Sequence, residues 1–399
     1  MSTAYPPLRL KPREGRRLRA GHLWVYSNEV DTKATPLTNF APGDPVVIVD
    51  AADHPVGIGY VNPSRLICAR MVTRDVSIAL DRSLITHRLN VARSLRDRLF
   101  DTPSYRLVHG EADGLPGLIV DRYGDVLVVQ MNTAGMDRLR DEVLAALEKV
   151  MKPRAVMLRN DSSARETEGL PRVREWAIGA AVDEVSLTEN GVAYFAPLAS
   201  GQKTGWYFDQ RMNRARLMAW AHDKRVLDVF SYVGAFGLAA AAAGAKEVVC
   251  VDSSGPALEG VRANAERNGF AERVRIIEAD AFEALARLRA EREHFDIVVL
   301  DPPAFIKRRK DHKEGLNAYR RLNQMAMQVL AKDGLLVSAS CSFHLARDEL
   351  RDTILAAGRH VDRFVQIVEQ GSQSPDHPVH PAIPETDYLK AYFARVLPN

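Results

Sequence analysis

Residues 226–237 read VLDVFSYVGAFG, an apolar run that passes through two glycines into the alanine-rich stretch 238–243. A short apolar run of this kind predicts a buried β-strand, and the alanines after it predict a helix. Glycines at such a bend let a ligand approach the backbone closely, because they carry no side chain. The stretch therefore predicts a strand–turn–helix unit of an α/β sheet, with a ligand bound at the turn.

The same alternation continues on the C-terminal side of this stretch. Near-continuous apolar strands separated by helices are typical of a parallel sheet that is covered on both faces. The end of the chain differs, because a proline-rich loop at 374–384 separates two strand-like runs without an obvious helix, which predicts an antiparallel pair closing the sheet. The expected strands are 226–230, 247–251, 274–278, 296–300, 335–339, 364–369 and 388–396.

Acidic residues stand at or near the ends of the first three of these strands, at Asp228, Asp252 and Asp280. Ligands of a doubly wound sheet bind outside the carboxyl ends of its strands, and a carboxylate about 20 residues past the glycines can accept hydrogen bonds from ribose hydroxyls. We therefore expect a nucleoside to bind here. The predicted cofactor site comprises Asp228, Phe230, Gly234, Gly237, Asp252, Ser253 and Asp280.

The chemistry of this turn separates two kinds of nucleoside cofactor. The dinucleotide pattern G-x-G-x-x-G is absent, and Asp228 would repel a pyrophosphate. The same carboxylate can pair with the ammonium group of a methionine moiety. The pattern thus resembles the class I methyltransferases, which use S-adenosylmethionine, although the glycines alone would also suit an ordinary tight turn.

Two later strand ends carry residues suited to chemistry. Asp301 is followed by Pro302 and Pro303, whose stiff backbone fixes the chain as it leaves the sheet, and Cys341 lies just past the fifth strand. Neighbouring strands lie about 4.8 Å apart, so the two residues share a pocket if their strands are adjacent. Cys68 and Cys250 lie within or beside apolar strands and fit the role of inert small hydrophobes.

A thiol beside a methyl donor indicates covalent catalysis on a pyrimidine. A thiolate that adds at C6 makes C5 nucleophilic enough to attack a sulfonium methyl group. Cys341 needs local help to ionise, because a free thiol has a pKa of about 8.5. Asp301, with a pKa raised by burial, is the candidate donor toward cytosine N3. The base that removes the C5 proton stays unassigned, since a packed or capping role suits the nearby His344 better.

Composition limits the class of protein. With 399 residues we expect two or three domains, and 46% hydrophobic with 26% charged residues is typical of soluble globular proteins. No apolar run approaches the roughly 18 residues of a membrane span, and the N-terminus has no signal-peptide core. Three scattered cysteines suit neither a disulfide framework nor a zinc site, so we expect no metal and a cytoplasmic location.

Three zones follow one another along the chain. Short apolar stretches between glycines and prolines at 44–50 and 55–61 predict a small N-terminal β-barrel. The middle of the chain mixes a predicted amphipathic helix with hairpins at 117–129 and at Asn190-Gly191, which predicts an α+β domain. The predicted domains are residues 1–75, 76–200 and 201–399.

Basic residues form two clusters although the net charge is only +3. Such clusters suit phosphate backbones, while a solvated surface would explain either one alone. A base in folded RNA would also have to be extruded to reach the catalytic pocket. The predicted RNA contacts are Arg16, Arg17, Lys307, Arg308, Arg309 and Lys310.

Three further motifs, GHLWVYSN at 21–28, GEADGLPGL at 110–118 and GQKTGWYFDQR at 201–211, combine with the Asp228 loop and with the Asp301 and Cys341 segments. Together they resemble the ribosomal RNA large subunit methyltransferase I family over nearly the whole chain. The resemblance implies an N-terminal PUA RNA-binding domain, a central α+β domain and a C-terminal Rossmann-like domain. It also implies 5-methylcytosine formation in large-subunit ribosomal RNA, a dimer, and Cys341 as nucleophile. Its implied cofactor-lining residues are Phe208, Asp209, Gln210 and Arg211.

One departure leaves alternatives open. Two-cysteine 5-methylcytosine enzymes place a second cysteine beside the Asp-Pro segment, where this chain has Pro303-Ala304, so the product-release step is unassigned. Asp-Pro-Pro followed by an aromatic also resembles enzymes that methylate exocyclic base amines. Methylation of a base nitrogen, on guanine in ribosomal RNA, is therefore the second hypothesis. The third is an RNA-binding ribosome assembly factor without catalysis.

Overall fold

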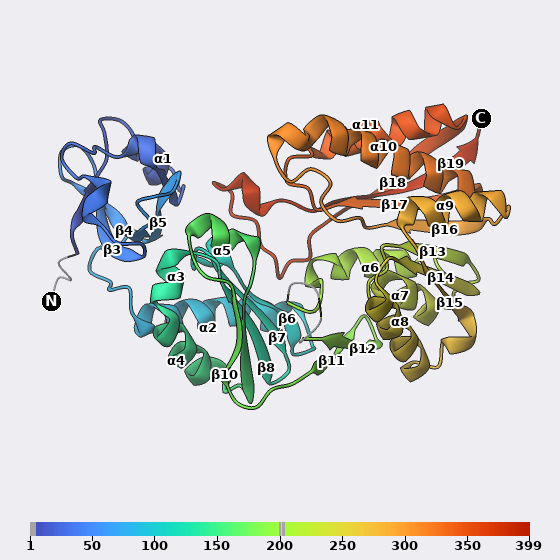
Figure 1. Ribbon diagram of the computed structural model, residues 1–399, viewed down its shortest axis with the longest axis horizontal. Coiled ribbons are helices and arrows are strands. Elements are labelled where there is room, and N and C mark those ends of the chain that lie inside the picture. The colour runs from blue at the N-terminus through green and yellow to red at the C-terminus, as the bar shows by residue number, and fades with distance from the viewer. Residues whose placement is uncertain (1–4, 199–200, 202–203) are drawn as a thin grey trace. The chain divides into compact units, whose positions relative to one another are not determined.

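The computed structural model describes residues 5–198, 201 and 204–399 (Figure 1). The contacts divide the chain into two compact units, one of Met1–Val185, Leu198–Trp206 and Pro375–Thr386, the other of Ser186–Pro197, Tyr207–Ser374 and Asp387–Asn399. Gln202 and Lys203 of the 201–211 motif lie outside the described residues. A bilayer-spanning segment would require a long apolar helix, and the described part of the chain contains none.

The first unit begins with a five-stranded sheet of order β1-β3-β4-β5-β2. Its strands are short, as their punctuation by glycine and proline predicted, and β4 must approach β5 very closely at Gly59. A Cβ there would lie 2.1 Å from the carbonyl oxygen of Arg70, so no other residue fits without movement. The elements are β1 (Pro7–Arg9), α1 (Gly15–Arg19), β2 (Trp24–Tyr26), β3 (Asp44–Val49), β4 (Pro55–Val61) and β5 (Ile67–Thr73).

The rest of the first unit is a second five-stranded sheet, of order β10-β9-β8-β7-β6, with helices packed on it. The predicted hairpin is confirmed as the antiparallel pair β7–β8. Asp81 caps the long helix α2 by accepting hydrogen bonds from the backbone of Ser83 and Leu84. The elements are α2 (Arg82–Leu99), β6 (Ser104–His109), β7 (Leu118–Tyr123), β8 (Val126–Met131), α3 (Ala134–Arg138), α4 (Arg140–Met151), β9 (Ala155–Asn160), α5 (Ser163–Glu168) and β10 (Val173–Ile178).

The two sheets of the first unit share buried contacts. Tyr60 on β4 is buried, and its hydroxyl donates a hydrogen bond to the carbonyl of Pro116 at 2.6 Å. Ile58 and Tyr60 belong to the same apolar cluster as Leu118 and Val129 of the second sheet. This shared core explains why residues before and after position 75 form one compact unit, and the domain boundaries at 75 and 200 stay a prediction.

A two-stranded hairpin, β11 (Glu184–Glu189) and β12 (Val192–Pro197), follows the first unit. Asn190 and Gly191 form its turn with φ of 52° and 80°. Positive φ at both central residues is what a type I′ turn requires, and Asn-Gly supplies it at little cost. The hairpin predicted from this dipeptide is confirmed.

The second unit is built on a seven-stranded sheet of order β15-β14-β13-β16-β17-β19-β18 (Figure 1). The first five strands are parallel, and β19 runs antiparallel between β17 and β18, so the predicted closing pair is confirmed. The strands are β13 (Arg225–Val229), β14 (Glu247–Asp252), β15 (Val274–Glu278), β16 (Phe295–Leu300), β17 (Leu330–Ser340), β18 (Arg363–Ser372) and β19 (Lys390–Pro398).

Both faces of this sheet are covered, which explains why its strands read as continuous apolar runs. Leu227 and Val229 pack with α9, α10 and α11, whereas Val226 packs with α6, α7 and α8 on the other face. The carboxyl ends of β13, β14, β16 and β17 consequently form one edge where polar residues can gather. The helices are α6 (Arg211–Met218), α7 (Ala235–Ala242), α8 (Gly255–Arg267), α9 (Ala281–Ala290), α10 (His312–Val329) and α11 (Arg347–His360).

Candidate functional site

The loop between β13 and α7 holds an unusual backbone. Phe230 and Tyr232 have φ of 66° and 50°, values that cost a non-glycine residue about 1–3 kcal/mol each, while Gly234 has φ of 84°. Backbone hydrogen bonds hold this shape: Ser231 N donates to the carbonyl of Val251 at 3.0 Å, and Gly234 N to that of Ser231 at 2.8 Å. Strain maintained by the surrounding structure is typical of a ligand clamp.

Asp228 is the buried carboxylate beneath this loop, with 1% of its surface exposed. Its Oδ2 accepts a hydrogen bond from Gly237 N at 2.8 Å, whereas its Oδ1 is buried and has no hydrogen-bond partner within the described part of the chain. Burial, helped by the charges of Asp301 and Asp252, raises the pKa of Asp228 to about 7. An acceptor left in this state fits a cationic group such as the ammonium of S-adenosylmethionine.

Gly237 is required by the packing around Asp228. A Cβ at this position would lie 2.7 Å from Cys250 Sγ and 3.3 Å from Asp228 Oδ2. Val248 Cγ1 would lie only 2.9 Å away as well, so the backbone N–H of residue 237 reaches the carboxylate without movement of either neighbour only when the residue is glycine. The glycine predicted for the cofactor turn thus positions the carboxylate as well as the chain.

Asp252, at the end of β14, is fixed by backbone donors on both oxygens. Oδ1 accepts from Ser254 N at 3.0 Å and Oδ2 from Tyr232 N at 2.9 Å. Each oxygen keeps a second lone pair, so the group can still accept hydrogen bonds from ribose hydroxyls. Ser253, beside it, is exposed at the same edge.

Asp280 has a local role that the sequence analysis did not consider. Its Oδ1 accepts hydrogen bonds from the backbone of Phe282 at 2.8 Å and of Glu283 at 3.4 Å, so it caps α9. An acid at this position is favoured by helix capping alone, and the D-x-x-E spacing could have indicated it. Its predicted contact with the cofactor stays a prediction.

The segment Phe208–Gln210 joins the predicted cofactor residues to Asp301. Gln210 donates from Nε2 to Asp301 Oδ1 at 2.8 Å, and its Oε1 accepts from Asn213 at 2.6 Å. Asp209 Oδ2 accepts a hydrogen bond from the hydroxyl of Tyr388 at 2.7 Å. Two motifs 91 residues apart thus meet through one amide.

Arg211 points its charge into the protein. The residue is buried, and its Nε lies 3.2 Å from Glu189 Oε2, while Arg214 Nε lies 2.5 Å from Oε1 of the same glutamate. Its guanidinium also stands over the ring of Phe208, 5.3 Å from the centroid. Arg211 and Phe208 are therefore buried against each other, and their packing holds the segment that carries Gln210.

Asp301 and Cys341 follow adjacent strands, as expected. β16 and β17 pair in parallel with Leu300 opposite Ser338, and each residue comes just after its strand. Burial raises the pKa of Tyr207, and Asp301 and Cys341 are among the groups whose charges raise it further. The two residues consequently act on one side chain and lie in one neighbourhood.

The serines that flank Cys341 are buried, and hydrogen bonds fix their hydroxyl groups. Tyr319 on α10 exchanges hydrogen bonds of 2.8 Å with the hydroxyls of both Ser340 and Ser342, and Ser342 Oγ also accepts from Ile306 N at 3.2 Å. Both serines are buried, whereas Cys341 between them is partly exposed. The other cysteines, Cys68 and Cys250, are fully buried, and burial raises the pKa of each thiol.

Aromatic rings and one lysine complete the site: Phe230 was predicted from the sequence, whereas Phe305, Tyr319 and Lys390 were not. The ring of Phe305 lies 6.4 Å from that of Phe230 and 4.8 Å from that of Tyr319, measured between centroids. Lys390 at the start of β19 is 5% exposed, and its Nζ donates to the carbonyl of Ser342 at 2.6 Å. A lysine directly before the apolar run 391–394 was the signal available for it.

The predicted RNA contacts differ in their surroundings. Lys307, Arg308, Arg309 and Lys310 are all exposed, directly after the Asp301 segment. Arg16 is exposed as well, but Arg17 donates to both oxygens of Glu29, at 2.7 and 2.9 Å. Arg17 therefore has its charge balanced within the first unit.

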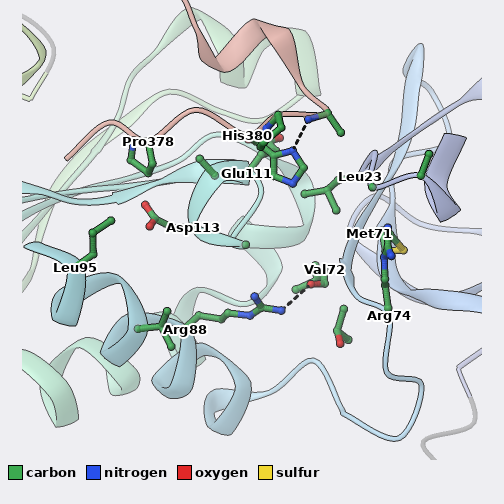
Figure 2. A pocket seen from close by; sticks show the side chains of 18 residues that line it. Leu23, Met71, Val72, Arg74, Arg88, Leu95, Glu111, Asp113, Pro378 and His380 are labelled. Atoms are coloured by element: carbon green, nitrogen blue, oxygen red, sulfur yellow. Dashed lines mark hydrogen bonds between the residues drawn. The ribbon is translucent and has the colours of Figure 1, made fainter. Parts of the chain in front are cut away.

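A cavity of about 640 Å³ lies in the first unit, apart from these residues (Figure 2). Arg88 on α2 reaches across it toward the carbonyl of Val72 at 3.4 Å. Asp113 at its wall is paired with Arg96 at 2.6 Å. None of the residues lining this cavity belongs to the predicted site.

Comparisons with known proteins agree with this geometry. A family model described as S-adenosylmethionine-dependent methyltransferase matches residues 163–392, and a PUA-like domain model matches residues 8–74. Proteins named ribosomal RNA large subunit methyltransferase I from Erwinia tasmaniensis and Pseudoalteromonas atlantica are 36% and 34% identical, each over 97% of this chain and 98% of its own length.

Solved structures support the fold. The crystal structure of SMU.776 complexed with SAH superposes with a TM-score of 0.83 at 21% identity, over 98% of this chain and 100% of that one. These findings confirm the predicted fold class and S-adenosylmethionine as the cofactor. The chain belongs to the ribosomal RNA large subunit methyltransferase I family, with a PUA-like domain ahead of its methyltransferase domain.

Proposed function

We propose that this enzyme methylates C5 of a cytosine in large-subunit ribosomal RNA, with Cys341 as a covalent nucleophile. The observation that carries the proposal is the position of Cys341. It is partly exposed and lies just past β17, next to β16, the strand that Asp301 follows. The other two cysteines are buried. The names of the relatives supply the RNA class.

The cofactor would be held by carboxylates at the sheet edge. Asp228 Oδ1 offers its unused acceptor to the ammonium group, and Asp252 offers lone pairs to the ribose hydroxyls. When bound, S-adenosylmethionine supplies an electrophilic methyl group on a sulfonium. The strained loop at Phe230 and Tyr232 sets the backbone against which it lies.

The cytosine would be activated by addition. The Cys341 thiolate forms a bond to C6, the C5 carbon takes the methyl group, and loss of the C5 proton then expels the thiolate and restores the double bond. Asp301, held by a hydrogen bond from Gln210, follows the neighbouring strand and is the group proposed to hold cytosine N3. The run from Lys307 to Lys310 would contact phosphates flanking the extruded base.

The test is methyl transfer from S-adenosylmethionine to ribosomal RNA purified from a strain lacking this protein, followed by mass spectrometry of the nucleosides. Cys341→Ala should lose transfer at least about 1,000-fold, as expected for removal of a covalent nucleophile. Cys68→Ala is the matched control, because it removes a thiol remote in sequence from the site.

Calorimetry separates loss of chemistry from loss of the cofactor. Cys341→Ala should bind S-adenosylmethionine with unchanged affinity, and the wild-type product should be 5-methylcytidine. Transfer at the wild-type rate by Cys341→Ala, or a methylated guanosine as product, would support methylation of a base nitrogen instead. A wild-type chain that binds the cofactor but modifies no ribosomal RNA would support an assembly factor.

A further inference from the structure

Lys390 is placed beside Cys341 by the pairing of β19 with β17. The two strands are antiparallel, and Lys390 stands directly opposite Ser340, the residue before Cys341. Its side chain is 5% exposed, and Nζ donates to the carbonyl of Ser342 at 2.6 Å. The ammonium group of Lys390 is therefore hydrogen-bonded to Ser342, the residue after Cys341. The backbone of Lys390 pairs with Ser340, the residue before Cys341.

The charges around Lys390 make Cys341 its main anionic neighbour. Burial, helped by the charge of Arg347, lowers the pKa of Lys390 to about 8. Cys341 opposes this shift more strongly than Asp387 and Glu349 do. A buried ammonium is costly unless an anion or several acceptors compensate it. The hydrogen bond to the carbonyl of Ser342 uses one of its three N–H groups.

Other groups near this turn are committed elsewhere. Arg347 donates through both terminal nitrogens to the carbonyls of Gly371 and Leu389, at 2.9 and 3.3 Å. Tyr319 is hydrogen-bonded to the two serines, and burial raises its pKa, so it stays neutral. The ring of His344 packs against that of Phe343, with centroids 5.3 Å apart.

The carboxylates of the site create the need for a cation. Asp209 and Cys341 both act on Tyr207, so a thiolate at Cys341 forms in a neighbourhood that already holds negative charge. Like charges disfavour ionisation and raise a thiol pKa, whereas an adjacent ammonium lowers it.

We propose that Lys390 is a positioning residue that keeps Cys341 ionised and fixes the turn 340–342. The inference rests on the proposed function, in which Cys341 is the nucleophile. In the free enzyme the Cys341 thiol gives its proton to water, and the Lys390 ammonium, already protonated, stabilises the thiolate that forms. When the cytosine adduct collapses, the thiolate returns to the same partner.

The pH dependence of Cys341 alkylation by iodoacetamide tests this pairing, with the Cys341 peptide quantified by mass spectrometry. In the wild type the thiol should titrate below its ordinary pKa of about 8.5. Lys390→Met keeps the length but removes the charge, and should raise that pKa by about one unit and slow alkylation at pH 7 about threefold to tenfold. Lys390→Arg, which keeps the charge, should restore most of the wild-type profile.

An alkylation profile of Lys390→Met that superimposes on the wild type, with both proteins folded by circular dichroism, overturns the inference. If Lys390→Met does not fold, the wild type and Lys390→Arg decide. A purely structural lysine would leave the pKa of Cys341 at the ordinary value of about 8.5 in both proteins, which would overturn the inference. Methyl transfer gives a second readout: loss of thiolate shifts the acid limb of the rate profile upward, whereas a distorted turn lowers the rate equally at every pH.

Failure of the two proposals can be told apart. Retained methyl transfer by Cys341→Ala removes the covalent mechanism but leaves the measured thiol pKa and its dependence on Lys390 intact. An unchanged thiol pKa in Lys390→Met combined with an inactive Cys341→Ala removes the role of Lys390 and leaves the nucleophile.

Discussion

Asp228 is the residue whose ionisation should control cofactor affinity. Burial raises its pKa to about 7, and a cation bound at Oδ1 favours the ionised form. Below pH 7 the Asp228 carboxyl is protonated, and its deprotonation on binding reduces the observed binding free energy. The dissociation constant for S-adenosylmethionine should therefore rise by up to about tenfold per unit as the pH falls from 7 to 5, and stay flat above pH 8.

Calorimetry across this range measures that effect, with Asp228→Asn as control. The asparagine can still accept from Gly237 but does not titrate, so its weaker affinity should not vary with pH over the same interval. Equal wild-type affinity at pH 6 and pH 8 would mean that Asp228 is not the group that meets the ammonium.

Gln210 should matter for the reaction more than for cofactor binding. Gln210→Ala removes the donor that holds Asp301 Oδ1 at 2.8 Å, a hydrogen bond worth about 0.5–1.5 kcal/mol. We expect methyl transfer to fall about twofold to tenfold with little change in cofactor affinity, measured by initial rates and calorimetry. Asn213→Ala, which removes only the support behind Gln210, should have a smaller effect; the reverse order would contradict this assignment.

At the scale of elements, the start of α7 is packed too tightly for any side chain. Gly237→Ala places a Cβ 2.7 Å from Cys250 Sγ, so it should destabilise the protein by about 1–3 kcal/mol and weaken cofactor binding through Asp228. The double variant Gly237→Ala/Cys250→Ala removes the sulfur but leaves Val248 Cγ1 2.9 Å from the new Cβ, so it should recover part of both. Urea unfolding measures the stability, and an absence of recovery would show that the contact with Cys250 is not what requires glycine.

The exposed run Lys307–Lys310 is the element expected to meet RNA phosphates. Replacing Lys307 and Lys310 by Glu should weaken RNA binding and reduce the slope of log affinity against log salt, because fewer counterions are released. Cofactor affinity should not change. Lys332→Glu is the control, an exposed lysine near the start of β17; an equal loss of RNA binding in that variant would indicate a general charge effect.

At the scale of the whole molecule, local signals foretold the strands and their connections. Apolar runs, the Asn190-Gly191 turn and the proline-rich gap after β18 each act within a few residues, so the hairpins, the parallel strands and the closing antiparallel pair could be predicted from them. The edge that gathers Asp228, Asp252 and Asp301 follows from parallel strand order alone.

Contacts between residues far apart in the chain could not be predicted from the sequence. Lys390 meets Ser342 across 48 residues, and Gln210 meets Asp301 across 91, through pairings that no local pattern encodes. The ion pair between Arg17 and Glu29 depends on how the first unit folds, which the pattern of short strands in the sequence does not specify. The shared core around Tyr60 likewise arises from packing between elements far apart in the chain.

The formation of a covalent bond between Cys341 and its substrate is the central claim, and an RNA carrying 5-fluorocytosine tests it most directly. Fluorine at C5 cannot leave as a proton does, so methyl transfer should halt with the RNA attached to the enzyme. Intact mass spectrometry should show a one-to-one adduct for the wild type with S-adenosylmethionine, mapped to the Cys341 peptide and absent from Cys341→Ala. No adduct in a wild-type enzyme that methylates the unmodified RNA, or an adduct in Cys341→Ala, would contradict the mechanism.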